Sequence, residues 1–196
     1  MSEEEILSIV RKYAISNSEN NDLHGFPHVE RVYNLCLHLG KNLRANLFLL
    51  KIAAYLHDVG RIPIKKESYN KNHAEVSADM ALELLKSCGY NISQVDLDKI
   101  SHMIRAHSFS NNVEAKTLEA KILSDADKLD ALGAIGLYRT IVFTVKKQGG
   151  IDQVIEHLEN KIMKLKDLLF LDLSRKIAEE RHKIILEFYN KIKEEK

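Results

Sequence analysis

The stretch Ala53-Ala54-Tyr55-Leu56-His57-Asp58-Val59-Gly60 decides how this chain folds and where its chemistry lies. Apolar residues recur before and within it at the spacing of a buried helix. They are Val32, Leu35, Leu39, Leu43, Leu47, Leu50, Ala54 and Val59. A histidine and an aspartate in such surroundings must be paired, hydrogen-bonded or bound to a metal to offset their desolvation. We therefore interpret His57 and Asp58 as half of a metal site, in the last turn of a helix that Gly60 ends.

Composition restricts the class of protein. The chain has 196 residues, of which 45% are apolar and 29% charged, as expected for one globular domain. Only two prolines and eight glycines interrupt long stretches with a period of three to four residues, which predicts an all-α fold. The two cysteines form no C-x-x-C pair that could bind zinc.

The charge pattern narrows the choice of partners and location. A net charge of +1, with no basic stripe interleaved with aromatic residues, argues against nucleic acid as the main partner. No apolar run approaches the length of a membrane span, and the first residues carry no secretory signal. We expect a cytoplasmic protein without a membrane partner.

Within the single domain, we expect a metal-binding core over about 22–140 and a C-terminal helical extension over about 150–196. The stretch 117–136 is predicted to be one helix, rich in Ala and Gly in its second half. Apolar stripes over 151–169 and 173–192 predict two amphipathic helices. We expect these helices to pack on their own domain, with a homodimer as the alternative.

A second polar group precedes the His-Asp pair. Pro27 suits a first helical position and Gly25 permits a sharp entry, which places His28 in the first turn of a helix. Arg31 follows three residues later, on the same side of that helix. A histidine and an arginine near a positive helix end suit a metal next to a phosphate.

The residues after the His-Asp pair offer further candidates. The segment 61–71 has no clear period and several positive charges, among them Arg61 and Lys65, and could be a substrate loop or a solvated connector. His102 and His107 lie five residues apart, a poor spacing for binding one ion from one helix. His107 is the better functional candidate because it precedes a loop.

The third informative stretch contains three aspartates. Asp125 and Asp127 project to nearly opposite sides of the predicted helix, whereas Asp127 and Asp130 share a side. We choose Asp127 because small and apolar residues surround it. Together with the two histidines and Asp58, it forms a mixed nitrogen and oxygen set that suits Mn, Fe, Co, Ni, Zn or Mg and leaves positions open for water and phosphate.

These motifs, in this order, resemble the HD-domain metal-dependent phosphohydrolases, and within them the small stand-alone branch of proteins similar to YedJ and YpgQ. The matching stretches cover 24–32, 56–60, 72–78 and 118–136. The resemblance implies a compact multi-helix fold with a metal site between helices. It implies as metal ligands His28, His57, Asp58 and Asp127, with Asp125 as the alternative to Asp127.

The same resemblance favours a single metal ion. Some branches of the family hold two ions through additional histidines, for which His73, His102 and His107 are available here. However, the adjacent histidines and the Gly-Tyr-Pro triplet of the cyclic-dinucleotide phosphodiesterases are not in this sequence. The small deoxynucleoside 5'-monophosphatases carry a glutamate where this chain has Arg61, which argues against that substrate class.

The predicted function is hydrolysis of a phosphate ester or anhydride, with a nucleotide as the leading substrate class, by a metal-activated water. Arg31, Arg61, Lys65 and Lys128 are the candidates to bind the phosphate. Asp58 would hold the metal, while Asp125 and His107 are candidates to transfer protons. Two alternatives remain: a metal-binding module that senses a nucleotide without turnover, and a helical interaction protein without a metal.

Overall fold

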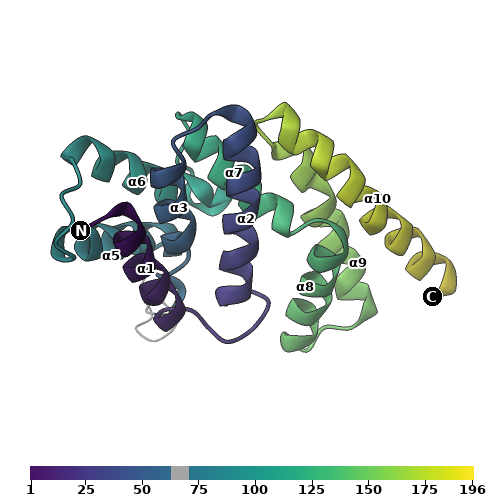
Figure 1. The fold of residues 1–196 in the computed structure, drawn as a ribbon. Coiled ribbons are helices and arrows are strands. Elements are labelled where there is room, and N and C mark those ends of the chain that lie inside the picture. The colour runs from purple at the N-terminus through teal and green to yellow at the C-terminus, as the bar shows by residue number, and fades with distance from the viewer. Residues whose placement is uncertain (63–70) are drawn as a thin grey trace. The chain divides into compact units, whose positions relative to one another are not determined.

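The computed structural model describes residues 1–62 and 71–196, and within these ranges the only regular elements are helices (Figure 1). The all-α prediction is therefore confirmed. The α-helices are α1 (Glu3–Ser16), α2 (Phe26–Leu43), α3 (Leu47–Leu56), α5 (His73–Ser87), α6 (Gln94–His107), α7 (Leu118–Asp130), α8 (Gly133–Lys146), α9 (Ile151–Asn160) and α10 (Asp172–Glu195). Two 3₁₀ helices are η1 (Phe109–Asn111) and η2 (Ile162–Leu168).

Two compact units make up the chain, Met1–Ser124 and Asp125–Lys196, with their boundary inside α7. The predicted division between a core and an extension stays a prediction of the sequence. None of the helices that the structure describes is long and apolar enough to cross a membrane.

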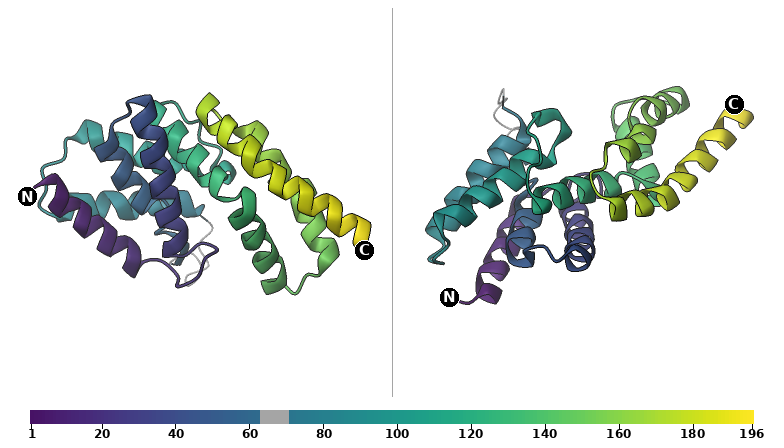
Figure 2. Two further views of the ribbon diagram at one scale, coloured as in Figure 1. Left: turned by 45° about the vertical axis from the view of Figure 1, so that its right-hand side comes forward. Right: turned by 90° about the horizontal axis from the view of Figure 1, so that it is seen from above.

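In the first unit, α3 is the central helix. It packs against α1, α2, α5 and α6, and these neighbours surround it in Figures 1 and 2. Its sequence explains this position, because the seven residues Leu49, Leu50, Ile52, Ala53, Ala54, Tyr55 and Leu56 are all buried. The turn that follows α3 is therefore held by helices on several sides.

Side-chain caps define where the helices of this unit begin. Ser2 and Glu5 form a capping box at the start of α1, and the side chain of Ser93 caps α6. Gly25 precedes α2, where a Cβ atom would lie 2.1 Å from the carbonyl oxygen of Glu19. The entry to α2 thus requires glycine, and Pro27 takes the second helical position instead of the predicted first one.

Gly60 has a different role from the one we expected. The helix ends at Leu56, and Gly60 is not among the glycines with positive φ. Instead, a Cβ atom on Gly60 would lie 2.6 Å from both the carbonyl oxygen of His73 and the backbone nitrogen of Ser77. Glycine is required here because it lets α5 approach the turn after α3 closely.

The second unit consists of α8, α9, η2, α10 and the end of α7, with α8 against both α9 and α10 (Figure 2). The prediction of one helix over 117–136 is wrong. Leu132 is extended and Gly133 has a φ of +76°, so α7 ends at Asp130 and α8 begins at Gly133. The first apolar stripe likewise divides, into α9 and η2.

Candidate metal centre

His57 and Asp58 lie directly after α3, where His57 is the C-cap residue. Both residues are buried. Nδ1 of His57 lies 2.7 Å from the carbonyl oxygen of Ala54, and a carbonyl can only accept, so Nδ1 carries the proton. The neutral ring then has its lone pair on Nε2, and a backbone carbonyl that fixes the tautomer in this way is typical of metal-binding histidines.

Oδ2 of Asp58 and two imidazoles form a first candidate group of metal ligands, namely His28, His57 and Asp58. Nε2 of His28 and Nε2 of His57 lie 3.6 and 3.7 Å from Oδ2. The two nitrogens are 3.4 Å apart. Two atoms each about 2.1 Å from a tetrahedral ion are separated by about 3.4 Å, so these three atoms have the spacing of metal ligands.

Oδ1 of Asp58 faces a second candidate group, which adds His73 and His107. Their Nε2 atoms lie 3.4 and 3.6 Å from Oδ1 and 3.4 Å from each other. Oδ1 is buried and has no hydrogen-bond partner among the residues that the structure describes. A buried carboxylate oxygen without a partner is costly, and a cation held by these atoms would remove that cost.

His107 is oriented in the same way as His57. Its Nδ1 lies 2.6 Å from the carbonyl oxygen of Ile104, which again places the lone pair of the neutral ring on Nε2. Asn72 accepts the backbone N–H of Ala74 and donates to Ser110, which fixes the start of α5 beside His73. The donor set of two imidazoles per carboxylate oxygen fits a divalent transition metal.

Arg61 is the charged neighbour of Asp58. Its Nε donates to Oδ2 of Asp58 at 2.5 Å. Burial by itself would raise the pKa of Asp58, but the positive charge of Arg61 holds this pKa well below its usual range. Asp58 is therefore ionised at neutral pH, as a metal ligand has to be.

The other three predicted phosphate-binding residues are Arg31, Lys65 and Lys128. Arg31 donates to the carbonyl oxygen of Asp22 at 3.0 Å. Lys65, with most of the predicted substrate loop, falls outside the described residues. Lys128 belongs to the second unit, where it is buried with its Nζ 5.5 Å from the centre of the Phe170 ring.

Asp125 and Asp127 also belong to the second unit, on the last part of α7. The two oxygens of Asp125 accept the backbone N–H groups of Phe170 at 2.9 Å and Leu171 at 3.0 Å. Burial raises the pKa of Asp125 in spite of these hydrogen bonds. Asp125 thus anchors the segment that leads into α10, a contact that its predicted role in proton transfer did not anticipate.

The sequence did not single out His73 as a ligand, although it offered a signal. The four histidines of the two groups all lie at helix ends: third in α2, directly after α3, first in α5 and last in α6. His102 lies in mid-helix, and its Nε2 accepts the backbone N–H of Lys116. Position at a helix end separates the four histidines of the candidate groups from His102.

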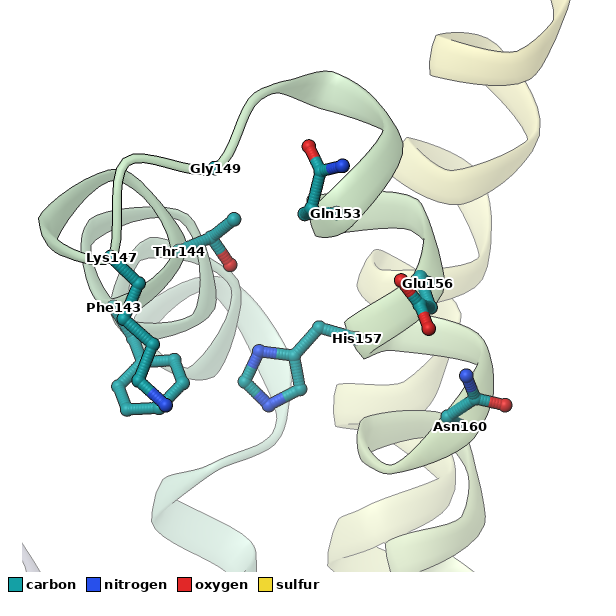
Figure 3. Close-up of a pocket in the computed structure, with 8 residues that line it drawn as sticks. All are labelled: Phe143, Thr144, Lys147, Gly149, Gln153, Glu156, His157 and Asn160. Atoms are coloured by element: carbon teal, nitrogen blue, oxygen red, sulfur yellow. The ribbon is translucent and has the colours of Figure 1, made fainter.

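In the described part of the chain, two cavities are lined by other residues. One, of about 290 Å³, belongs to the second unit between α8 and α9 (Figure 3). The Phe143 and His157 rings are neighbours there, with centroids 5.3 Å apart and an angle of 58° between the ring planes. The other cavity, of about 270 Å³, lies in the first unit near Phe48 and Tyr90. None of the candidate residues lines either cavity.

The sequence model of the HD domain matches residues 25–132. The chain belongs to the HD domain family. Its sequence is similar to that of YpgQ from Bacillus subtilis (strain 168), with 28% identity over 98% of this chain and 92% of YpgQ. These comparisons and the His/Asp groups support a metal-dependent hydrolase.

Solved structures agree with this assignment. The crystal structure of Bacillus subtilis YpgQ matches with a TM-score of 0.80 and 28% identity over 100% of this chain and 97% of that one. A structure of YpgQ in complex with ADP matches with a TM-score of 0.79 and 26% identity over the same shares. The structure of a predicted HD superfamily hydrolase from an uncultured Thermotogales bacterium matches with a TM-score of 0.68 and 28% identity over 98% of this chain and 91% of that one.

Proposed function

We propose that this chain is a phosphohydrolase that cleaves a phosphate ester or anhydride bond of a nucleotide. The observation that carries the proposal is Asp58, a buried and ionised carboxylate whose two oxygens each face a pair of imidazole Nε2 atoms. The complex of YpgQ with ADP supports a nucleotide as the ligand. A divalent ion held here would acidify a bound water and polarise a phosphate oxygen.

We assign the first group, His28, His57 and Asp58, to this ion. On the resemblance to the family we further propose Asp127 as the remaining ligand. The tautomer set by the Ala54 carbonyl orients His57 before an ion binds, so little reorganisation is needed.

The second group, Asp58, His73 and His107, gives His107 two alternative roles. If one ion binds, neutral His107 can accept a proton through Nε2, because its Nδ1 is held by the Ile104 carbonyl. If a second ion binds, His107 is one of its ligands. The measured number of ions per chain decides between these roles.

Arg31, Arg61, Lys65 and Lys128 are the proposed phosphate contacts. Arginine suits this role because its planar guanidinium can donate two parallel hydrogen bonds to a phosphate. Of the two arginines, Arg61 lies directly at the carboxylate of Asp58. We propose Arg61 as the main phosphate contact and Arg31 as a second one.

The experiment is a turnover screen on wild type and Asp58→Asn, with nucleoside mono-, di- and triphosphates and added Mn, Fe, Co, Ni, Zn or Mg. Ion chromatography distinguishes release of orthophosphate from release of pyrophosphate and so identifies the bond. We expect metal-dependent product formation that Asp58→Asn lowers by at least about a hundredfold, the scale on which loss of a catalytic charge acts.

Two controls separate the alternatives. Binding of nucleotide and metal to wild type without any product would identify a sensing module instead of an enzyme. Equal turnover by wild type and Asp58→Asn, with circular dichroism showing both folded, would refute the proposed site.

A further inference from the structure

The contact between Arg61 and Asp58 involves the oxygen that the first metal group needs. Nε of Arg61 lies 2.5 Å from Oδ2, and the same Oδ2 faces the Nε2 atoms of His28 and His57. The side chain of Arg61 is 24% exposed, whereas that of Asp58 is only 1% exposed. The guanidinium therefore reaches from the edge of the site to a buried carboxylate.

We propose that Arg61 exchanges partners on metal binding: it neutralises Asp58 in the metal-free protein and is released to bind phosphate when an ion binds Oδ2. This inference rests on the proposed metal site. It adds that metal binding and phosphate binding are coupled through a single guanidinium.

Electrostatics supplies the reason for the exchange. An ion bound to Oδ2 and a guanidinium on the same oxygen are like charges a few ångströms apart in a buried site, where their repulsion is weakly screened. The ion carries two charges and also gains two imidazole ligands, so it outcompetes the single charge of Arg61. The free energy of the lost contact between Arg61 and Asp58 then makes metal binding weaker by that amount.

A released Arg61 has an evident new partner. It stands three residues after Asp58 in the chain, so its guanidinium stays within reach of a phosphate oxygen next to the ion. Phosphate is the oxyanion that a guanidinium binds in bidentate geometry. Because linkage is reciprocal, phosphate that takes Arg61 away from Asp58 must strengthen metal binding by the same factor.

The test is the affinity for Mn²⁺, measured by isothermal titration calorimetry on wild type, Arg61→Ala and Arg11→Ala. Arg11 is the matched control because its guanidinium pairs with another carboxylate, that of Glu30, at 2.6 Å. We expect Arg61→Ala to bind Mn²⁺ about tenfold more tightly, within the usual range for coupled sites, and Arg11→Ala to bind like wild type. Inorganic phosphate should tighten Mn²⁺ binding to wild type and lose this effect in Arg61→Ala.

A second measurement needs no variant. In ¹⁵N-labelled wild type, the Nε–H resonance of Arg61 should lose its hydrogen-bonded shift when Zn²⁺, a diamagnetic ion, is added. An unchanged resonance at saturating Zn²⁺, or equal or weaker Mn²⁺ affinity in Arg61→Ala, would overturn the exchange while leaving the metal site intact. Failure of wild type and Arg61→Ala alike to bind any metal would instead overturn the metal site itself, and the exchange with it.

Discussion

Substitution of Gly60 by alanine tests whether the close approach of α5 to the turn after α3 builds the metal site. The added Cβ would lie 2.6 Å from the carbonyl oxygen of His73 and from the backbone nitrogen of Ser77. Ordinary contact begins near 3.4 Å, so α5 must retreat by about 0.8 Å. The Gly60 N–H, which donates to Oγ of Ser77 at 2.9 Å, would lose its partner in that movement.

The size of the movement permits an estimate of the loss of stability and of the effect on metal binding. Overpacking of this kind costs about 1–3 kcal/mol. In a chain of this size, that free energy lowers Tm by about 2–12 °C. His73 moves with α5, and a metal site tolerates displacements of only about 0.5 Å, so binding by the second group should be lost as well.

The assay combines thermal unfolding followed by circular dichroism with metal analysis after dialysis. Gly89→Ala is the matched control: its φ of +77° makes alanine strained, but no atom lies within 4 Å of the added Cβ. We expect Gly89→Ala to lose stability and keep its full metal content, and Gly60→Ala to lose both stability and any ion bound by the second group. A Gly60→Ala variant with wild-type Tm and metal content would refute this account of the turn.

Three further predictions follow from single contacts. Asp125→Ala should destabilise the second unit by about 1–3 kcal/mol per N–H left unpaired, seen as a lower Tm, whereas Asp125→Asn, which keeps one acceptor, should lose less. If Asp125→Asn keeps its fold and metal but loses turnover, the predicted proton transfer by Asp125 is supported. Burial, with Lys161 and Lys147, lowers the pKa of His157, so unfolded chains bind more protons and stability is lost as pH falls below about 6.5. Urea unfolding between pH 5 and 7 should show a smaller pH dependence for His157→Gln than for wild type, and equal slopes would contradict this. His102→Ala should keep full metal content by elemental analysis, whereas His107→Ala should lose any ion bound by the second group.

Several elements could be predicted because local chemistry determines them. The capping box at Ser2 and Glu5, the Ser93 cap and the helix end at Gly89 follow from residues close together in the chain. The adjacent His57 and Asp58 were recognisable because polar residues in an apolar helix end need a partner. These predictions required no knowledge of how the helices pack.

Other features were hidden because they depend on residues distant in sequence. Gly60 looked like a helix stop, yet it is required by the backbone of α5, whose contacting residues begin thirteen positions later at His73. The break between α7 and α8 at Leu132 and Gly133 lay inside a stretch with good helical periodicity. Asp125 was predicted as a site residue, and nothing local in the sequence indicated that its oxygens accept N–H groups 45 and 46 residues away.

The sequence by itself determined the all-α class and the HD motif, because helical periodicity and the cost of burying polar groups are local properties. The grouping of His28 with His57 and Asp58 was implied only by the resemblance to the family. Only the tertiary structure decided that His73 and His107 meet the second oxygen of Asp58 and that Arg61 holds the first. The physical reason is that a carboxylate has two oxygens, and the fold alone determines what faces each of them.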